Sequence, residues 1–333
     1  MLVSGKGEGW HLDSSFSILK ERTRLEMIKL SNGHELEFLA ASGSLAFDGR
    51  GWPWEWPLRW LGLLDPYLFT IVTKTIMPEP WRGNLRWTHP WDVVKFISEE
   101  GKEIHPIKAL TNPASIGGVI NAIGLTGPGV ETWIENDYPK IERSGLKVIV
   151  SITRERGQSC RGMVKRLSGL KNVVGIEYNS SCPNVGPILL DSPEIVIRNC
   201  CEIKGESDYP VLLKLGYAQP YLEIAMALQG TVEAISINTV PWKTIFGGKI
   251  SPLAKYGGGG VSGPVAKPII WKMISELARE ISIPVIGAGI WEYEDISRLK
   301  SFGASAFQTG TLFLPYPCRP TRYVKRWRQE RGG

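Results

Sequence analysis

The sequence lacks the long apolar runs that membrane spans require. No run approaches the roughly 18 residues that cross a bilayer. The first residues, MLVSGKGEGWHLDSSF, contain no apolar core of a secretory signal. We therefore predict a cytoplasmic protein that does not bind membranes.

Metal-binding cysteine patterns are missing as well. The five cysteines are Cys160, Cys182, Cys200, Cys201 and Cys318, and they form neither a CxxC pair nor a Cys/His cluster. Zinc and iron–sulfur sites need such groupings, so we predict no metal site in this chain. An odd number of cysteines favours free thiols in a reducing compartment.

Acidic residues are outnumbered by basic ones, which gives a net charge of +6. The tail RPTRYVKRWRQERGG supplies much of this charge. A basic surface attracts anions, including nucleic acid, but charge runs usually face water. We expect a solvated C-terminal helix and no nucleic-acid partner, with RNA binding as the alternative.

Thirteen tryptophans are present, and four of them fall in GWPWEWPLRW at 51–60. They alternate with proline and charge and show no amphipathic period. We expect a packed loop or a lid beside the active-site mouth.

Eight short apolar runs recur along the chain, and most are followed by a segment with helical spacing. Near-continuous apolarity is typical of strands buried on both faces, and eight such repeats predict an α/β fold of the (β/α)8 TIM-barrel type. The runs are 35–42, 68–75, 146–152, 173–179, 210–216, 233–239, 283–289 and 305–311. The helical segments are 157–170, 192–204, 219–229, 265–281 and 291–302.

The rest of the chain departs from this repeat. We expect an N-terminal extension over 1–30 and a single barrel domain over 31–333. MIKLSNGHELEF predicts a hairpin turning at Asn32-Gly33, which would plug the bottom of the barrel. Two long insertions, about 76–145 and 240–264, belong to the C-terminal face, where long loops are usually functional.

Polar residues fall where the predicted strands end. The fourth run ends at Asn179 and leads to Cys182 and Asn184. The second ends in Thr73-Lys74-Thr75, the fifth carries Lys214 and the sixth ends in Asn238-Thr239. Chemistry in TIM barrels sits at the carboxyl ends of the strands. Two lysines, several amides and the Cys182 thiol are therefore expected at one mouth.

Glycines mark the last two strand ends, at Gly287, Gly289 and Gly310. Such positions let backbone N–H groups approach a phosphate, although tight turns alone would also use glycine. The lysines need anionic partners in an apolar setting. A flavin would supply one, and an ion pair with Glu177 or Glu233 is the alternative.

These elements, read in order as TKT, NAIGL, NSSCPNVG, KLG, INT, GGGGVSG, IGAGI and GASAFQTGT, resemble the dihydroorotate dehydrogenase family over about residues 36–314. The chain looks like the soluble, class 1 type. The resemblance implies FMN as cofactor and oxidation of (S)-dihydroorotate to orotate in pyrimidine biosynthesis. It also leaves open a homodimer and an iron–sulfur electron-transfer subunit.

The resemblance also implies a role for each motif residue. Cys182 would be the base that removes the C5 proton while C6 gives hydride to the flavin. The substrate would contact Lys74, Asn121, Ile123, Gly124, Leu125, Asn179, Asn184, Asn238 and Thr239. FMN would contact Ala41, Ser42, Lys74, Asn179, Lys214, Asn238, Gly263, Gly287, Gly289, Gly310 and Thr311. A buried core thiol is the simpler reading of Cys182.

Three residues depart from the family pattern: Gly127 replaces an expected Asn, Ala288 a Gly, and Ser180 a Leu. They leave other functions open. The alternatives are an FMN-dependent tRNA-dihydrouridine synthase, a dihydropyrimidine-type dehydrogenase and a non-catalytic flavin-binding subunit.

Overall fold

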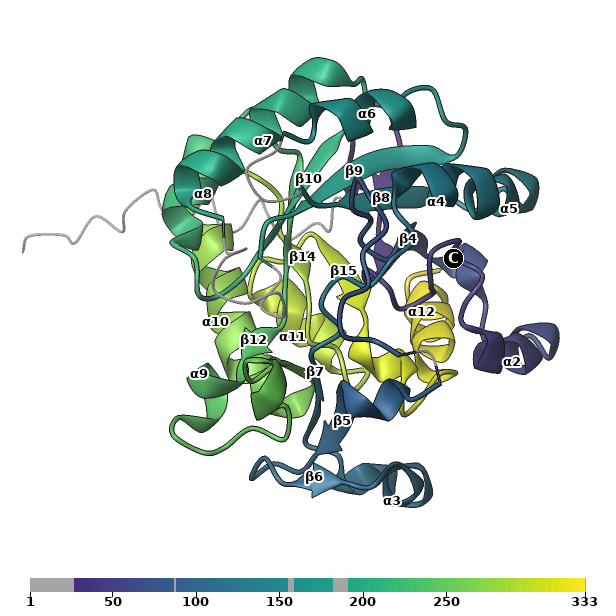
Figure 1. Cartoon of the computed structure of the whole chain (residues 1–333), viewed down its shortest axis with the longest axis vertical. Helices are drawn as coiled ribbons and strands as arrows, with labels where there is room; N and C mark the ends of the chain where they lie inside the picture. Colours follow the sequence, from purple (N-terminus) through teal and green to yellow (C-terminus); the bar gives the residue numbers. More distant parts are fainter. Residues whose placement is uncertain (1–26, 87, 155–158, 182–190, 333) are drawn as a thin grey trace, which may run out of the picture.

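The eight apolar runs form one parallel sheet in a computed structural model, which describes residues 27–86, 88–154, 159–181 and 191–332 (Figure 1). Its strands are β3 (Phe38–Ala40), β4 (Thr70–Val72), β8 (Val148–Ile152), β9 (Val173–Asn179), β10 (Val211–Leu215), β11 (Ala234–Ile237), β14 (Ile286–Gly287) and β15 (Ala306–Thr309). Pairing runs in the order β11-β10-β9-β8-β4-β3-β15-β14. A parallel bridge between Ile235 and Val285 joins the two ends, so the predicted barrel is confirmed.

Helices cover the outside of this barrel, each in the stretch between two strands. They are α4 (Val130–Asn136), α5 (Tyr138–Ser144), α6 (Arg161–Leu167), α7 (Pro193–Glu206), α8 (Tyr221–Ala227), α10 (Lys267–Glu280) and α11 (Asp295–Ser301). In α10 the buried residues Ile270, Met273, Ile274 and Leu277 follow helical spacing. The five predicted helices are confirmed, four of them with shorter bounds, whereas α7 extends two residues beyond the predicted end.

The N-terminal hairpin closes the bottom of the barrel. Strands β1 (Ile28–Lys29) and β2 (Glu35–Leu36) pair antiparallel, and Gly33 takes a φ of +84° in the turn. Ile28, Leu30 and Leu36 belong to one buried cluster with a residue from every barrel strand. The predicted plug is therefore confirmed.

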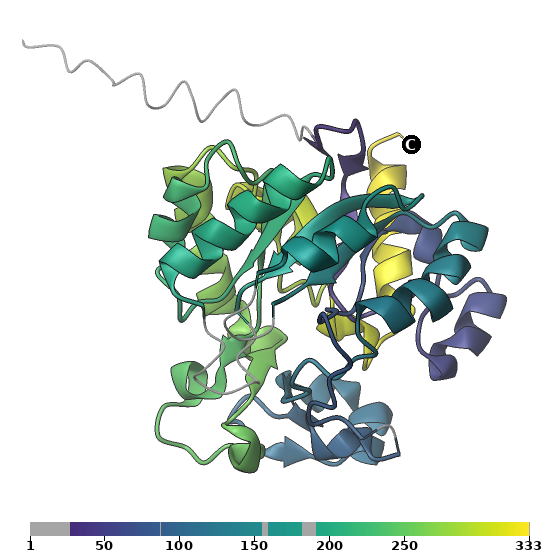
Figure 2. The ribbon, with the colours of Figure 1, turned by 45° about the horizontal axis from the view of Figure 1, so that its top comes forward.

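The two insertions form a second sheet, which the sequence did not reveal. It has the order β12-β13-β7-β5-β6, built from β5 (Val94–Ile97), β6 (Glu103–Ile104), β7 (Gly118–Asn121), β12 (Val240–Pro241) and β13 (Gly260–Ser262). Short helices α3 (Pro106–Thr111) and α9 (Trp242–Phe246) flank it. Figure 2 shows these blue and green segments side by side next to the barrel. The prediction that both insertions are loops was wrong. Their strands pair across about 140 positions of the chain, and a local sequence pattern cannot reveal such a pairing.

The Trp-rich segment is only partly packed. Trp52 stacks on Trp54 and donates from Nε1 to the Gly43 carbonyl (3.1 Å), next to the end of β3. The following helix α2 (Trp56–Trp60) leaves Trp60 81% exposed. The prediction of a packed loop is therefore confirmed for Trp52, and it is wrong for the helix α2.

The basic tail forms α12 (Arg319–Glu330), which lies against the barrel on one face. Trp327 is buried there in edge contacts with Phe38 and Phe307, whereas Arg322 and Lys325 are exposed. The tail is therefore a packed barrel helix with one solvated face. No helix among the described residues is long and apolar enough to cross a bilayer.

Leu36→Ala should lower the free energy of unfolding by about 2–5 kcal/mol, because it opens a cavity between the plug and the barrel floor. Leu36 is fully buried. Urea unfolding measures the change. Lys29→Ala, on the exposed side of the same hairpin, should stay within about 0.5 kcal/mol of the parent. Equal effects of the two substitutions would contradict the plug.

Glu55 should make stability depend on pH. Its buried carboxylate accepts the Trp52 backbone N–H (2.8 Å). Burial raises the pKa of Glu55 from 4.5 to about 7, against the smaller opposing effect of that hydrogen bond. The folded state then keeps a proton that the unfolded state loses, so the free energy of unfolding falls as pH rises from about 4.5 to 7 and stays lowered above.

Glu55→Gln should remove this contribution while keeping an acceptor for Trp52. Urea unfolding at several pH values between 4.5 and 8 compares the variant with the parent. The variant should gain stability relative to the parent as pH rises, and a constant difference across the range would refute the assignment.

Candidate functional site

The side chains inside the barrel change from apolar to polar toward the carboxyl ends of the strands. Positions two apart in a strand point the same way. Leu212 belongs to the apolar cluster at the plug, and Lys214 lies two residues farther along the same strand, toward its carboxyl end. Ala234 and Ser236 repeat the pattern in β11. The barrel thus has an apolar floor and a polar upper layer.

Hydroxyl and amide groups connect the upper layer across neighbouring strands. Thr75 Oγ1 lies 3.1 Å from Ser42 Oγ and 3.0 Å from Ser151 Oγ. It also accepts from Asn179 Nδ2 at 3.0 Å. Residues from the ends of β3, β4, β8 and β9 therefore share one network. The predicted site residues Ser42 and Asn179 are brought together in it.

The same network ends on a buried carboxylate. Glu177 accepts from Ser151 Oγ (3.0 Å) and from Ser236 Oγ (2.7 Å). Lys214 Nζ lies 3.8 Å from Glu177 Oε1, with both side chains buried. The ion pair with Glu177, which the sequence left open as the alternative partner of Lys214, therefore forms. Glu233 instead pairs with Lys204 at 3.4 Å, away from this layer.

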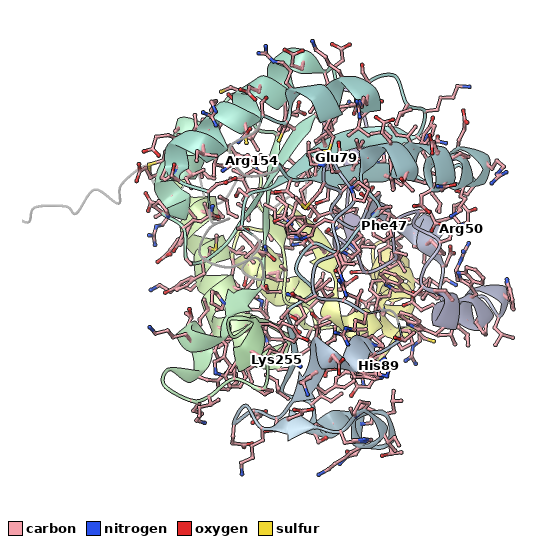
Figure 3. The ribbon with its side chains drawn as sticks, in the orientation of Figure 1. Phe47, Arg50, Glu79, His89, Arg154 and Lys255 are labelled. Carbon is pink, nitrogen blue, oxygen red and sulfur yellow. The ribbon has the colours of Figure 1, made fainter. Side chains whose placement is uncertain are left out.

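Lys74 lies at the same mouth beside an aromatic ring. Its side chain is buried and its Nζ is 5.4 Å from the centroid of Phe47, which is labelled in Figure 3. Cation–π contact stabilises a partly desolvated ammonium. A Cβ on Gly43 would lie 3.5 Å from Lys74 Cγ, so the backbone after β3 lies against this lysine.

Asn238 and Thr239 form the end of β11. Asn238 Nδ2 donates to the Ser181 carbonyl (2.9 Å), and Asn238 Oδ1 accepts the Thr239 N–H (2.8 Å). Ser181 precedes Cys182 directly in the chain. The first bond fastens the backbone that follows β9 to the end of β11, two strands away in the barrel.

Ser180, one of the departures from the family pattern, also anchors the backbone at the end of β9. Its Oγ donates to the Lys214 carbonyl at 3.0 Å, and Gln219 Nε2 donates to the Ser180 carbonyl at 3.2 Å. A leucine could not make the bond to the Lys214 carbonyl, because it has no hydroxyl, whereas its backbone carbonyl could still accept from Gln219. Ser180 therefore ties β9 to β10.

Asn121 comes from the second sheet and not from a barrel strand. It ends β7, opposite Val94 and Gly260. The segment after it, with Ile123 and Gly124, is fixed by contacts with residues 81–85: Trp81 Nε1 donates to the Gly124 carbonyl (3.0 Å) and the Asn84 N–H to the Ile123 carbonyl (2.9 Å).

The segment that follows β7 has an unusual backbone conformation. Leu125 adopts a φ of +62°, which is costly for a residue with a side chain. Gly127 forms a bridge with Trp81, and its Cα lies near the ring of Phe47. Phe47 thus contacts both Lys74 and the departure at 127.

Three buried oxygen atoms near the mouth lack a hydrogen-bond partner among the described side chains and backbone: Asn179 Oδ1, Gln308 Oε1 and Thr309 Oγ1. Such an atom costs about 1–3 kcal/mol unless something donates to it. All three belong to the upper parts of β9 and β15. A ligand in the mouth with N–H or O–H groups would satisfy Asn179 Oδ1 and Gln308 Oε1, whereas Thr309, the next residue in β15, points to the other side of the strand.

The glycines at the ends of β14 and β15 are required for different structural reasons. A Cβ at Gly287 would lie 2.9 Å from Ala304 Cβ, so this glycine is required by packing against the connection from α11 to β15. Its predicted phosphate contact stays a prediction. Gly289 has a φ of +89° beside the Trp271 indole, where a side chain would be strained.

Gly310 and three other predicted FMN contacts, Ala41, Gly263 and Thr311, lie where the barrel and the second sheet meet. A Cβ at Gly310 would lie 3.1 Å from Ala41 Cβ, and Thr311 Oγ1 donates to Ser262 Oγ at 2.5 Å. Gly263 follows Ser262 and packs against Gly118. The second sheet thus touches the barrel beside the end of β15.

Cys182 and Asn184 lie outside the described residues, so their predicted roles stay predictions. The described residue after them, Asp191, forms a buried ion pair with Arg154 (Nη2–Oδ1 2.5 Å) and accepts from the Tyr178 hydroxyl. Burial raises the pKa of the neighbouring Cys160 thiol to about 12, with smaller contributions from Asp191 and Glu202. Cys160 is thus an unreactive core thiol. Arg154 is labelled in Figure 3.

Comparison with known proteins identifies the family. The family model "Dihydroorotate dehydrogenase" matches residues 108–317. The chain belongs to the dihydroorotate dehydrogenase family. That stretch includes β7, α4 to α11 and the barrel strands from β8 to β15, and therefore most of the site.

Two relatives are named "Dihydroorotate dehydrogenase B (NAD(+)), catalytic subunit", from Bacillus mycoides (strain KBAB4) and Bacillus anthracis (strain A0248). Each is 33% identical over 211 residues, which is 61% of this chain and 68% of the relative. The ligand-free structure of DHODH from Eimeria tenella has a TM-score of 0.63 at 16% identity and covers 88% of this chain and 85% of that one. The fold of this dihydroorotate dehydrogenase homologue is therefore that of the family.

Four residues of the upper layer were missed from the sequence: Thr75, Ser151, Ser236 and Gln308. Glu177 was named only as an alternative partner of the lysines, because a charge inside a strand buried on both faces needs a partner. Serine and threonine are common in strands and loops, so their alignment on one barrel layer follows from strand register alone.

Proposed function

We propose that this chain oxidises (S)-dihydroorotate to orotate. Membership of the dihydroorotate dehydrogenase family carries this proposal, since the matched stretch contains the predicted thiol, all four predicted amides and Lys214. The polar upper layer and its two unpartnered oxygen atoms, Asn179 Oδ1 and Gln308 Oε1, support a small ligand bound at the mouth.

FMN is the cofactor that we propose for this mouth. Asn179 Oδ1 and Gln308 Oε1 would accept hydrogen bonds from the flavin ring or ribityl chain, and the Lys214 ammonium would face its polar edge. The strained turn at Gly289 and the junction of Gly310 with Ala41 would receive the phosphate. The full set would be Ala41, Ser42, Lys74, Asn179, Lys214, Asn238, Gly263, Gly287, Gly289, Gly310 and Thr311.

When bound, FMN supplies an acceptor for the two electrons and the hydrogen that leave C6 of the substrate. Cys182 would take the C5 proton on its sulfur as a general base. The Lys74 ammonium, held beside Phe47, would bind the substrate carboxylate. Asn121, Asn179, Asn184, Asn238 and Thr239, with the segment Ile123–Gly124–Leu125, would hold the ring.

The electrons must leave the flavin for a further acceptor. The Bacillus relatives are named as NAD(+)-dependent catalytic subunits, and this chain has no cysteine pattern for a cluster. We propose that an iron–sulfur partner subunit carries electrons to NAD+. The homodimer expected from the resemblance is also a proposal, which the mass in solution tests.

Dihydroorotate should bleach the yellow absorbance of the purified flavoprotein under anaerobic conditions, and dihydrouracil should do so much more slowly because it lacks the carboxylate for Lys74. Stopped-flow spectroscopy compares the two rates. Preference for dihydrouracil would favour a dihydropyrimidine-type dehydrogenase. Bleaching by neither compound would favour a non-catalytic subunit or, with salt-sensitive tRNA binding, a dihydrouridine synthase.

Cys182→Ala should retain FMN but reduce the rate of flavin reduction by dihydroorotate about 10²- to 10⁴-fold, the usual contribution of a general base. Flavin content is measured by the fluorescence of released FMN. Cys201→Ala is the matched control, since Cys201 is an exposed thiol on α7. Reduction of the Cys182 variant at the parental rate would exclude the thiol as the base.

A further inference from the structure

Glu177 is a buried acid in the upper layer of the barrel. It lies near the end of β9, is 1% exposed, and each of its carboxylate oxygens accepts a serine hydroxyl, from Ser151 and from Ser236. Hydrogen bonds to a charged acceptor are stronger than neutral ones. The two serines therefore stabilise a negative charge at this depth.

The counter-charge of Glu177 is Lys214. Strand register places Lys214 opposite Asn179 on one side and opposite Ser236 on the other. The 3.8 Å between Nζ and Oε1 exceeds normal hydrogen-bond length, so the attraction acts through space. In a poorly hydrated interior such an interaction is much stronger than in water.

The Glu177–Lys214 pair lies between the apolar floor of the barrel and its polar mouth. The floor below is apolar, with Leu212 and Ala234 at the plug. Beside it, Asn179 presents the unpartnered Oδ1 to the mouth. The Lys214 ammonium thus lies between a fixed carboxylate and the proposed ligand site.

We propose that Glu177 is a positioning residue that sets the reduction potential of the bound flavin through Lys214. The inference rests on the proposed function, because it requires a flavin at the mouth. An ammonium stabilises the negative charge that collects on a reduced flavin. The negative charge of Glu177 attracts that ammonium and cancels part of its electric field at the flavin. The flavin is then a weaker oxidant than Lys214 alone would make it, and its electrons pass on more readily.

Glu177→Gln tests this, since the amide keeps the shape and can still bond both serines but has no charge. The reduced form of FMN should be favoured about tenfold at equilibrium, which is about 30 mV for a two-electron couple. Equilibration with a reference dye measures the shift. Lys214→Met should shift the equilibrium in the opposite direction.

Ser236→Ala is the matched control, because it removes a hydrogen bond from Glu177 and leaves both charges. It should change the potential less than Glu177→Gln does, while thermal unfolding of the flavin-free proteins reports the structural cost of each variant. If the amide variant does not fold, Glu177→Asp replaces it. The shorter side chain withdraws the carboxylate from Lys214 and should give a smaller shift in the same direction.

The outcomes separate this inference from the proposed function. An unchanged or lowered potential in the Glu177 variant, with dihydroorotate still reducing the flavin, overturns the role of Glu177 alone. A parent protein that takes up no FMN overturns both. A raised potential in the Glu177 variant and a lowered one in Lys214→Met support the assignment.

Discussion

Parallel hydrogen bonding around a closed ring of eight strands is the constraint on which this structure depends. Closure through Ile235 and Val285 gives every strand two neighbours and forces alternate side chains into one interior. That interior cannot be polar throughout, because buried polar groups need partners. The chain fills the lower part with apolar residues and a hairpin plug, and confines polar groups to the upper part, where strand ends and ligands can satisfy them.

The upper layer shows how a barrel gathers chemistry from distant parts of a sequence. Ser42, Thr75, Ser151 and Glu177 come from four strands or strand ends and are joined by successive hydrogen bonds. Each group orients the next, so the layer is preorganised before any ligand binds. The unpartnered oxygen atoms at its edge mark where this arrangement is incomplete without a ligand.

The second sheet adds a wall to the mouth that the barrel repeat cannot provide. Its strands β7 and β13 bring Asn121 and Gly260 together from the two insertions. Contacts such as Thr311 with Ser262 connect this wall to the barrel. Substrate and cofactor contacts expected from the family would thus come from two sheets, and the insertions are needed for the site to be complete.

The sequence by itself determined the eight strands, the hairpin at Asn32-Gly33 and the amphipathic helices, because periodicity and turn chemistry are local properties. It also determined the family, through short motifs such as NSSCPNVG. Only the tertiary structure decided that Lys214 meets Glu177, that the insertions pair as a sheet, and that α12 packs through Trp327. Each of these depends on side chains or strands distant in sequence, whose approach is set by strand register and barrel closure.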